Sequence, residues 1–377
     1  MMESTTKIPS RAALLANISA VVVKIGTNAL CGADDRLDHR IIAQLAADVA
    51  QVWRQRNIRV TLVSSGAIGA GMTELALTKR PKDLPMLQAA AAIGQSRLIN
   101  SFAAALQPHG LHAGQILVSR RDFEDRVRYL NLRNCLHALH RCGALPIINE
   151  NDAVTVDEIR FGDNDLIAAH VTNLLQADLL ILLSVVDGLQ DGSGRVQPLV
   201  ETLDASVAHL VRPERSPRGS GGMGAKLAAA AVVRTAGEPV LIANGKEPNV
   251  VQRLLAGEEL GTLLRPAQRR LSARSRWISL TARTRGAMTV DTGAAAALRN
   301  NKSLLAGGIV TTRGDFAPGD AVAIVDSTGQ VIARGLSNYS RDDVEKIKGH
   351  KSREFSQLLD SETWYDEVVH RDDLVLE

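Results

Sequence analysis

The sequence of 377 residues is poor in aromatic side chains and in cysteine. Phe, Trp and Tyr together make up 3% of the chain, so we expect a core of Ala, Val, Leu and Ile. The three cysteines, Cys31, Cys135 and Cys142, form neither a CxxC pair nor an even framework, which favours reduced thiols in a cytoplasmic protein. No apolar run reaches the ~18 residues of a membrane span, and no secretory signal is evident, so we expect no membrane partner.

Several chemical signatures are also missing. The first expected strand is not followed by GxGxxG, which argues against a nicotinamide-dependent dehydrogenase. GxxxxGK[ST] and GxSxG are absent, which argues against a P-loop enzyme and a serine hydrolase. His137 and His140 have helical spacing, but no nearby carboxylate or cysteine completes a metal pattern, so we expect no protein metal centre.

Charge is nearly balanced overall but unevenly distributed. The formal net charge is +3, which requires no polyanionic partner. Residues 265–285 hold seven Arg and no acidic residue, whereas residues 285–377 hold 11 Lys and Arg against 15 Asp and Glu. The acidic end argues against strong nucleic-acid binding there, because such affinity rests on neutralising phosphates.

Most of the chain alternates short apolar runs with longer helical stretches. This pattern predicts an α/β fold in three layers, with a parallel sheet buried between helices. The expected strands are residues 21–25, 59–63, 116–118, 146–148, 179–183 and 239–242. The expected helices are residues 37–55, 86–106, 123–141, 166–175 and 224–235.

The pattern changes near residue 283 to short strands separated by glycine-containing turns. It predicts a small β-rich domain with strands at residues 288–290, 321–325 and 331–333. We therefore expect a catalytic domain at residues 15–270, an Arg-rich linker at 271–284 and the β-rich domain at 285–365.

Small and polar residues follow four of the expected strands, where open parallel sheets bind ligands. Two glycine-rich turns, Ser65 to Gly69 and Ser220 to Lys226, have backbone N–H groups that could bind phosphate, although each could be an ordinary turn or helix start. Lys24 interrupts an apolar strand, so its ammonium either reaches solvent or meets an anion. Asp163, Asn164 and Asp165 precede a helix and could cap it, orient lysines or hold Mg²⁺.

Six motifs in this order resemble the amino-acid kinase family, in particular its members that phosphorylate glutamate. They are VVVKIGTNA from Val21, SSGAIGAG from Ser64, AAIGQSRL from Ala91, INENDAV from Ile148, FGDNDLIAA from Phe161 and SGGMGAK from Ser220. The resemblance implies transfer of the γ-phosphoryl group of ATP, with Mg²⁺, to the side-chain carboxylate of L-glutamate, the first step of proline biosynthesis.

The same resemblance assigns roles to residues. Lys24 and Lys226 would be the catalytic lysines, with Asp163 and Asp165 orienting them. Glutamate would contact Ser65, Gly66, Asn149, Asp152 and Asn164. The nucleotide would contact Lys24, Ser184, Val185, Ser220, Gly221, Gly222, Met223, Gly224, Ala225 and Lys226.

The C-terminal section resembles a PUA domain, through the segments that begin at Gly286 and Gly314. The chain departs from the kinase pattern at Val185 and Gln190, where related enzymes often have Asp and Tyr, so Val185 can offer the nucleotide only backbone contacts. The resemblance further implies feedback inhibition by proline, hand-over of a labile acyl phosphate to glutamyl-phosphate reductase, and a homo-oligomer. The alternatives are a family member acting on acetylglutamate, aspartate or uridylate, and an RNA-binding protein.

Overall fold

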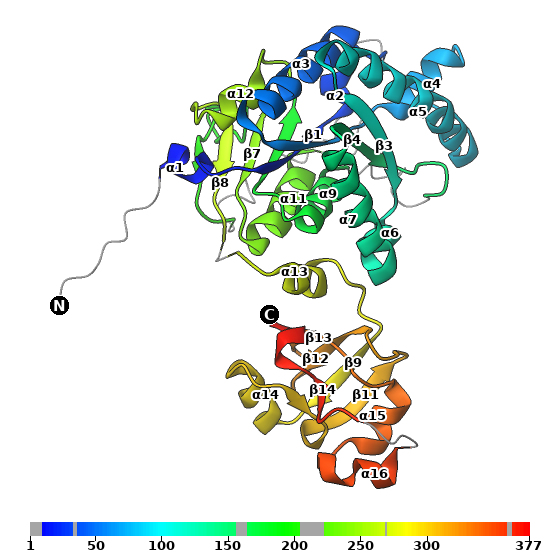
Figure 1. The fold of residues 1–377 in the computed structure, drawn as a ribbon, viewed down its shortest axis with the longest axis vertical. Coiled ribbons are helices and arrows are strands. Elements are labelled where there is room, and N and C mark those ends of the chain that lie inside the picture. Colours follow the sequence, from blue (N-terminus) through cyan, green and yellow to red (C-terminus); the bar gives the residue numbers. More distant parts are fainter. Residues whose placement is uncertain (1–9, 33–35, 156–163, 204–221, 268–269, 360–363) are drawn as a thin grey trace, which may run out of the picture. The chain divides into compact units, whose positions relative to one another are not determined.

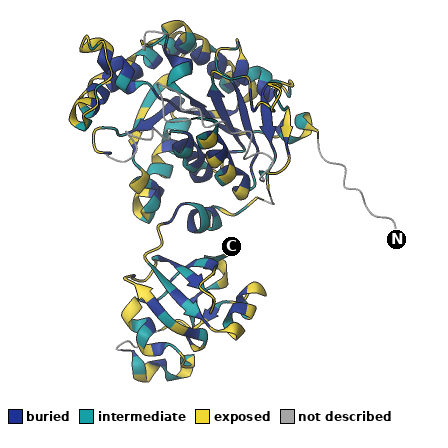
Figure 2. Cartoon of the chain, turned by 180° about the vertical axis from the view of Figure 1, so that it is seen from behind, coloured by how far each residue is buried: buried dark blue, intermediate teal, exposed yellow. Residues whose placement is uncertain are grey.

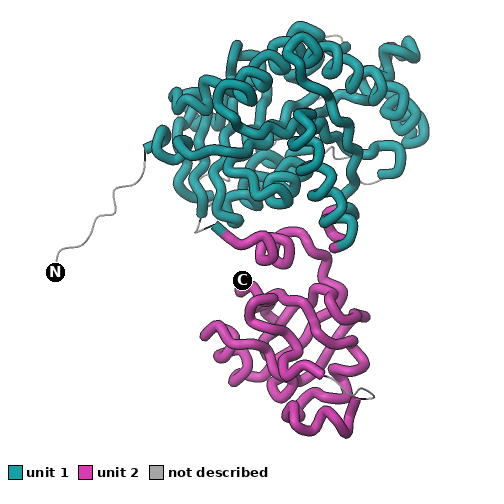
Figure 3. Tube along the Cα trace, viewed as in Figure 1, with its two compact units in different colours: residues 1–122, 127–270 teal, residues 123–126, 271–377 magenta. Residues whose placement is uncertain are grey.

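The structure is a computed structural model that describes residues 10–32, 36–155, 164–203, 222–267, 270–359 and 364–377 (Figure 1). It divides into two compact units (Figure 3). The first comprises residues 1–122 and 127–270, and the second comprises residues 123–126 and 271–377. No described helix is long and apolar enough to cross a membrane.

The first unit is built on an eight-stranded sheet of order β3-β4-β2-β1-β5-β7-β8-β6. Its strands are β1 (Ala20–Ile25), β2 (Arg59–Val63), β3 (His112–Val118), β4 (Ala144–Glu150), β5 (Leu179–Ser184), β6 (Leu199–Val200), β7 (Val240–Asn244) and β8 (Thr262–Leu264). All pairs are parallel except β7 with β8, which is antiparallel, so the expected parallel sheet is confirmed except at this pair. The chain reverses its direction of travel across the sheet between β1 and β5, the position where ligands bind in folds of this type.

Helices cover both faces of this sheet, which confirms the three-layer architecture (Figure 1). The helices of the first unit used below are α2 (Thr27–Leu30), α3 (His39–Arg56), α4 (Ala67–Glu74), α5 (Leu84–Leu106), α9 (Asn164–Leu175), α11 (Met223–Ala236) and α12 (Val250–Leu255). Helices α3, α5 and α12 lie over one face, and α9 and α11 over the other (Figure 1). A helix expected at residues 123–141 is instead two helices, α6 (Arg120–Glu124) and α7 (Arg126–Arg141).

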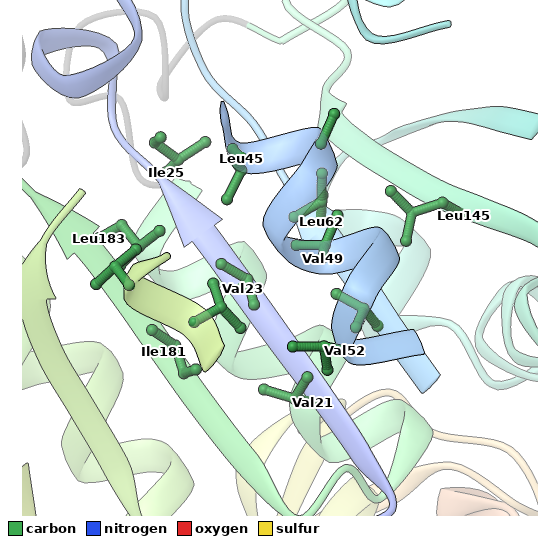
Figure 4. Close-up of a cluster of buried hydrophobic side chains, with 14 of the residues drawn as sticks. Val21, Val23, Ile25, Leu45, Val49, Val52, Leu62, Leu145, Ile181 and Leu183 are labelled. Atoms are coloured by element: carbon green, nitrogen blue, oxygen red, sulfur yellow. The ribbon is translucent and has the colours of Figure 1, made fainter. Parts of the chain in front are cut away.

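The central strand β1 divides its side chains between the two helical layers. Val21, Val23 and Ile25 pack in a hydrophobic cluster with α3 residues such as Val49 (Figure 4). Because side chains alternate along a strand, Lys24 points to the opposite face, toward α9 and α11. The inner strands of the sheet are the most deeply buried part of the unit (Figure 2).

The expectation that every strand is buried on both faces was wrong for β3. It is the edge strand of the sheet, and Leu117 within it is 39% exposed. An edge strand has one neighbour and incomplete cover, so an apolar run there does not prove burial.

The second unit has a five-stranded sheet of order β11-β9-β12-β13-β15, which confirms a separate β-rich domain. Its described α-helices and strands from residue 286 onward are β9 (Gly286–Val290), α14 (Thr292–Arg299), β10 (Leu304–Leu305), β11 (Ile309–Gly314), β12 (Ala321–Val325), β13 (Val331–Leu336), α15 (Arg341–Ile347), α16 (Phe355–Leu358), β14 (Glu367–Val369) and β15 (Leu374–Leu376). Met288, Val322, Ile324 and Phe355 are fully buried in its core. Sequence reasoning did not predict α14, α15 or α16.

The segment expected to be an Arg-rich linker contains helix α13 (Ala273–Leu280), which belongs to the second unit. Within that unit, the indole Nε1 of Trp277 donates a hydrogen bond to the carbonyl oxygen of Phe123 at 3.1 Å. The guanidinium of Arg126 lies 4.8 Å from the centroid of the same ring, a cation–π contact. The arginines of this segment therefore include ones that pack within a folded element, such as the fully buried Arg276.

Candidate active site

Two lysines from distant parts of the chain meet at one carboxylate. Lys24 Nζ on β1 lies 2.7 Å from Asp165 Oδ1, and Lys226 Nζ on α11 lies 3.0 Å from Asp165 Oδ2. All three side chains are buried, with Asp165 only 1% exposed. Burying a single unpaired ion is strongly unfavourable, and here each ammonium group is paired with the Asp165 carboxylate. The triad still places two positive charges around one negative charge, at a considerable cost in desolvation.

The ionisation of Asp165 follows from its partners. Burial tends to raise its pKa, but the charges of Lys24 and Lys226 and the hydrogen bonds they donate outweigh burial, and the net pKa lies below its ordinary value. Asp165 is therefore ionised at neutral pH. The triad carries a net positive charge in a water-poor environment, which suits an anionic ligand.

Three helices that begin near the carboxyl ends of the strands start with glycine. Gly26 precedes α2, Gly66 precedes α4 and Gly222 precedes α11, and none of these ends has a side-chain cap. By contrast, Asp38 and Asp83 cap α3 and α5 with side-chain oxygens. Uncapped N–H groups leave these three helix ends able to bind anions, and the missing Cβ gives access to the backbone.

Gly66 and Gly26 are required to lack a side chain for different reasons. Gly66 has φ of +100°, a left-handed conformation that side chains rarely adopt. At Gly26 an added Cβ would lie 3.5 Å from Lys24 Nζ, so the absence of a side chain keeps space open beside the ammonium group.

A second cluster of polar side chains lies at the ends of β2 and β4. Asn164 Nδ2, at the start of α9, donates to the carbonyl oxygen of Ser64 at 3.0 Å, to Ser65 Oγ at 2.8 Å and to Asn149 Oδ1 at 3.1 Å. Asn149 is buried at the end of β4, and its Nδ2 donates to Gln95 Oε1 on α5 at 2.7 Å. Four elements therefore converge on one hydrogen-bonded network.

Asp152 follows β4 and has an unusual environment. Burial raises its pKa to about 6, and the nearby charge of Arg80 opposes that rise. A partly buried carboxylate near a binding loop is a candidate for recognising a cation.

The structure brings together most of the site residues expected from sequence. Lys24, Asp165 and Lys226 form one group, and Ser65, Asn149 and Asn164 form the network that adjoins it through helix α9. Ser184 ends β5 next to β1, while the side chain of Val185 is 41% exposed. Gly222 immediately precedes Met223, Gly224 and Ala225 in the first turn of α11. The predictions for Asp163, Ser220 and Gly221 fall outside the described residues.

Sequence reasoning did not single out Gln95. It is only 8% exposed although it lies in an Ala-rich helix. The available signal was a long amide side chain in an otherwise apolar helix, and such a residue needs a buried partner.

The described residues contain no group of three or more His, Cys, Asp or Glu that could hold a metal ion. Asp165, the carboxylate nearest the lysines, is already paired with both of them. Mg²⁺ that accompanies a nucleotide is held mainly by phosphate oxygens and water, with one or two carboxylates, so it does not require a cluster of three protein ligands.

Comparison with known proteins agrees with this architecture. The amino acid kinase family matches residues 19–244, and the PUA domain matches residues 286–359. The chain therefore belongs to the amino acid kinase family, and its second unit contains a PUA domain.

Within this family, the chain is similar over nearly its full length to proteins named glutamate 5-kinase. A protein named glutamate 5-kinase from Caldanaerobacter subterraneus subsp. tengcongensis is 44% identical over 363 residues, covering 94% of this chain and 97% of that protein. Another of the same name from Geobacter metallireducens is 43% identical over 378 residues, covering 97% and 100%. Among solved structures, carbamate kinase from Giardia lamblia bound to AMP-PNP has a TM-score of 0.47 at 17% identity, covering 66% of this chain and 99% of that one.

Proposed function

We propose that this protein is a glutamate 5-kinase, which transfers the γ-phosphoryl group of ATP to the side-chain carboxylate of L-glutamate and so begins proline biosynthesis. The observation that carries the proposal is the convergence of Lys24 and Lys226 on Asp165, beside helix ends that start with glycine. The near full-length similarity to proteins named glutamate 5-kinase supports the choice of substrate.

The chemistry needs no general base. The side-chain carboxyl of glutamate has a reference pKa near ~4.3, so it is already an ionised nucleophile at neutral pH. The difficulty is that an anion attacks a polyanion. The protein therefore has to position the two groups in line and stabilise the charge on the transferring phosphoryl group.

In this proposal Lys24 and Lys226 donate to the phosphoryl oxygens, and Asp165 keeps both ammonium groups oriented while no ligand is bound. Backbone N–H groups at Gly222 to Ala225, with Ser184 and Val185, bind the nucleotide. Because the lysines are preorganised in a buried site, their charge acts more strongly than it would in water. The acceptor carboxylate attacks phosphorus, and ADP leaves as the acyl phosphate forms.

Glutamate would be held by the second cluster. Ser65 and Gly66 would bind one carboxylate group of glutamate. Asn149, Asn164 and the ionised Asp152 would bind its α-ammonium group. Asp152 is suited to this role because its carboxylate is shielded from bulk water, so its attraction to a cation is only weakly screened.

The direct test measures ADP release and hydroxylamine-trapped acyl phosphate with ATP and one acceptor at a time. Glutamate, aspartate and N-acetylglutamate should be compared in parallel. Glutamate should give the highest kcat/KM by at least tenfold. A higher value with either other acceptor would reassign the substrate within the family.

The interactions expected from the resemblance are part of the same proposal. Proline should inhibit the enzyme in competition with glutamate, which the same assay with added proline measures. We also propose a homo-oligomer, which sedimentation would detect, and hand-over of the product to glutamyl-phosphate reductase. Equal flux through the two enzymes when mixed and when separated by a membrane would count against the hand-over.

A further inference from the structure

The buried glutamine on α5 lies at the end of a directional chain of amide hydrogen bonds. Gln95 Oε1 can only accept, and it accepts from Asn149 Nδ2 at 2.7 Å. The amide oxygen of Asn149, Oδ1, accepts from the backbone N–H of Glu150 at 2.9 Å and from Asn164 Nδ2 at 3.1 Å. Each bond fixes which end of the next amide is donor and which is acceptor.

The last amide in this chain is left with an unused acceptor. Asn164 Nδ2 already donates to Ser64, Ser65 and Asn149. Asn164 Oδ1 is shielded from solvent and has no hydrogen-bond partner among the described residues. An amide oxygen without a donor at a binding site suits a ligand N–H group, such as an ammonium.

The backbone holds Gln95 in place from the other side. Its neighbour Gly94 packs so closely on α4 that an added Cβ would lie 1.8 Å from the carbonyl oxygen of Ala67 and 2.3 Å from Gly71 N. Ala67 is the first residue of α4, directly after Gly66. Helix α5 therefore carries Gln95 at a fixed position relative to the Ser65–Gly66 turn.

We propose that Gln95 is a positioning residue that holds the side chain of Asn149 in place and, through it, supports that of Asn164, so that the site presents an acceptor to the α-ammonium group of the substrate. The inference rests on the proposed function and adds a determinant of specificity to it. If the Gln95 acceptor is removed, Asn149 Nδ2 is left buried without a partner, although the Glu150 N–H still holds Asn149 Oδ1. The Asn149 side chain then shifts to satisfy this donor, which disturbs its contact with Asn164 and the position of the acceptor at Asn164 Oδ1.

The experiment compares Gln95→Met, which removes the acceptor, with Gln95→Glu, which keeps an acceptor oxygen. Gln55→Met on α3 is the matched control, because Gln55 is exposed. For each variant the KM for glutamate, the KM for ATP and the Ki of glutarate are measured. Glutarate has both carboxylates of glutamate but no ammonium group, so the ratio of its Ki to the KM for glutamate reports recognition of the ammonium.

For Gln95→Met we expect the KM for glutamate to rise at least tenfold, with the KM for ATP within twofold of the unmodified protein. The ratio of the glutarate Ki to the glutamate KM should fall at least fivefold. Gln95→Glu and Gln55→Met should keep that ratio within twofold. If Gln95→Met does not fold, Gln95→Glu still tests the proposal. A fall of more than twofold in the ratio of the glutarate Ki to the glutamate KM for Gln95→Glu would overturn it.

Two results with a folded Gln95→Met variant would also overturn it. One is an unchanged ratio, and the other is an equal rise in both KM values, which would indicate general disruption. An unmodified protein that is inactive with glutamate would instead refute the proposed function, so the two failures are distinguishable.

Discussion

Lys24 and Lys226 bind the two oxygens of one buried carboxylate, although one lies in the central strand and the other in a helix from a distant part of the chain. The contacts to Asp165 are 2.7 and 3.0 Å long. This arrangement preorganises two cations without a ligand. The negative charge of Asp165 offsets the repulsion between the two ammonium groups, and it remains beside them when an anionic ligand binds.

Removing the second lysine should impair chemistry more than binding. We expect Lys226→Ala to lower kcat by about 100-fold or more, the usual effect of losing one preorganised charge at a transition state. Steady-state kinetics with ATP and glutamate measure this effect. Lys302→Ala, at an exposed lysine of the second unit, should be unchanged. A kcat within threefold of normal for Lys226→Ala would remove this residue from the mechanism.

Neutralising the shared carboxylate should cost both stability and activity. Asp165→Asn preserves shape but leaves two buried ammonium groups without a counter-charge, and breaking a buried pair costs about 3–5 kcal/mol. We expect a loss of that order in the free energy of unfolding, measured by urea denaturation, and a fall in kcat. An unchanged unfolding midpoint would mean that another group neutralises the lysines.

Glutamate binding should depend on pH through Asp152. Burial raises its pKa in the folded protein to about 6, so the folded protein keeps a proton at pH 5 that the unfolded chain has largely lost. The contribution of Asp152 to folding stability therefore falls as pH rises from about 4 to 6. Over the upper part of this pH range the carboxylate ionises, and its ability to bind an ammonium group grows. We expect the KM for glutamate to rise as pH falls from 7 to 5.

Asp152→Asn tests this assignment directly. The KM for glutamate should be raised at neutral pH and should lose most of its variation between pH 5 and 7, while the KM for ATP changes little. A variant that keeps the normal pH profile would show that another group titrates in this range.

Close packing of α4 on α5 should make Gly94 intolerant of a side chain. In Gly94→Ala the new methyl group would overlap the backbone of α4, so the helices must separate. Overpacking of this kind costs about 1–3 kcal/mol. We expect thermal unfolding at a lower temperature and a raised KM for glutamate, because the Ser65–Gly66 turn begins α4. Ser96→Ala, at an exposed position of the same helix, is the control and should leave both values unchanged.

The sequence by itself determined the order of elements and many of the candidate site residues. Apolar runs such as residues 21–25 and 179–183 formed the central strands, because a strand covered on both faces requires an unbroken apolar pattern. Lys24 was noticeable because a cation interrupts such a run. The same reasoning failed for β3, whose apolar residues lie at a sheet edge.

Only the tertiary structure decided which residues meet. Nothing in the local sequence pairs Lys24 with Lys226, since their contact through Asp165 depends on how α9 and α11 pack on one face of β1. Gln95 likewise gained significance only when α5 placed it against Asn149. Local pattern reports burial and periodicity, whereas hydrogen bonds and ion pairs between distant segments arise from the packing of the whole sheet and its helices.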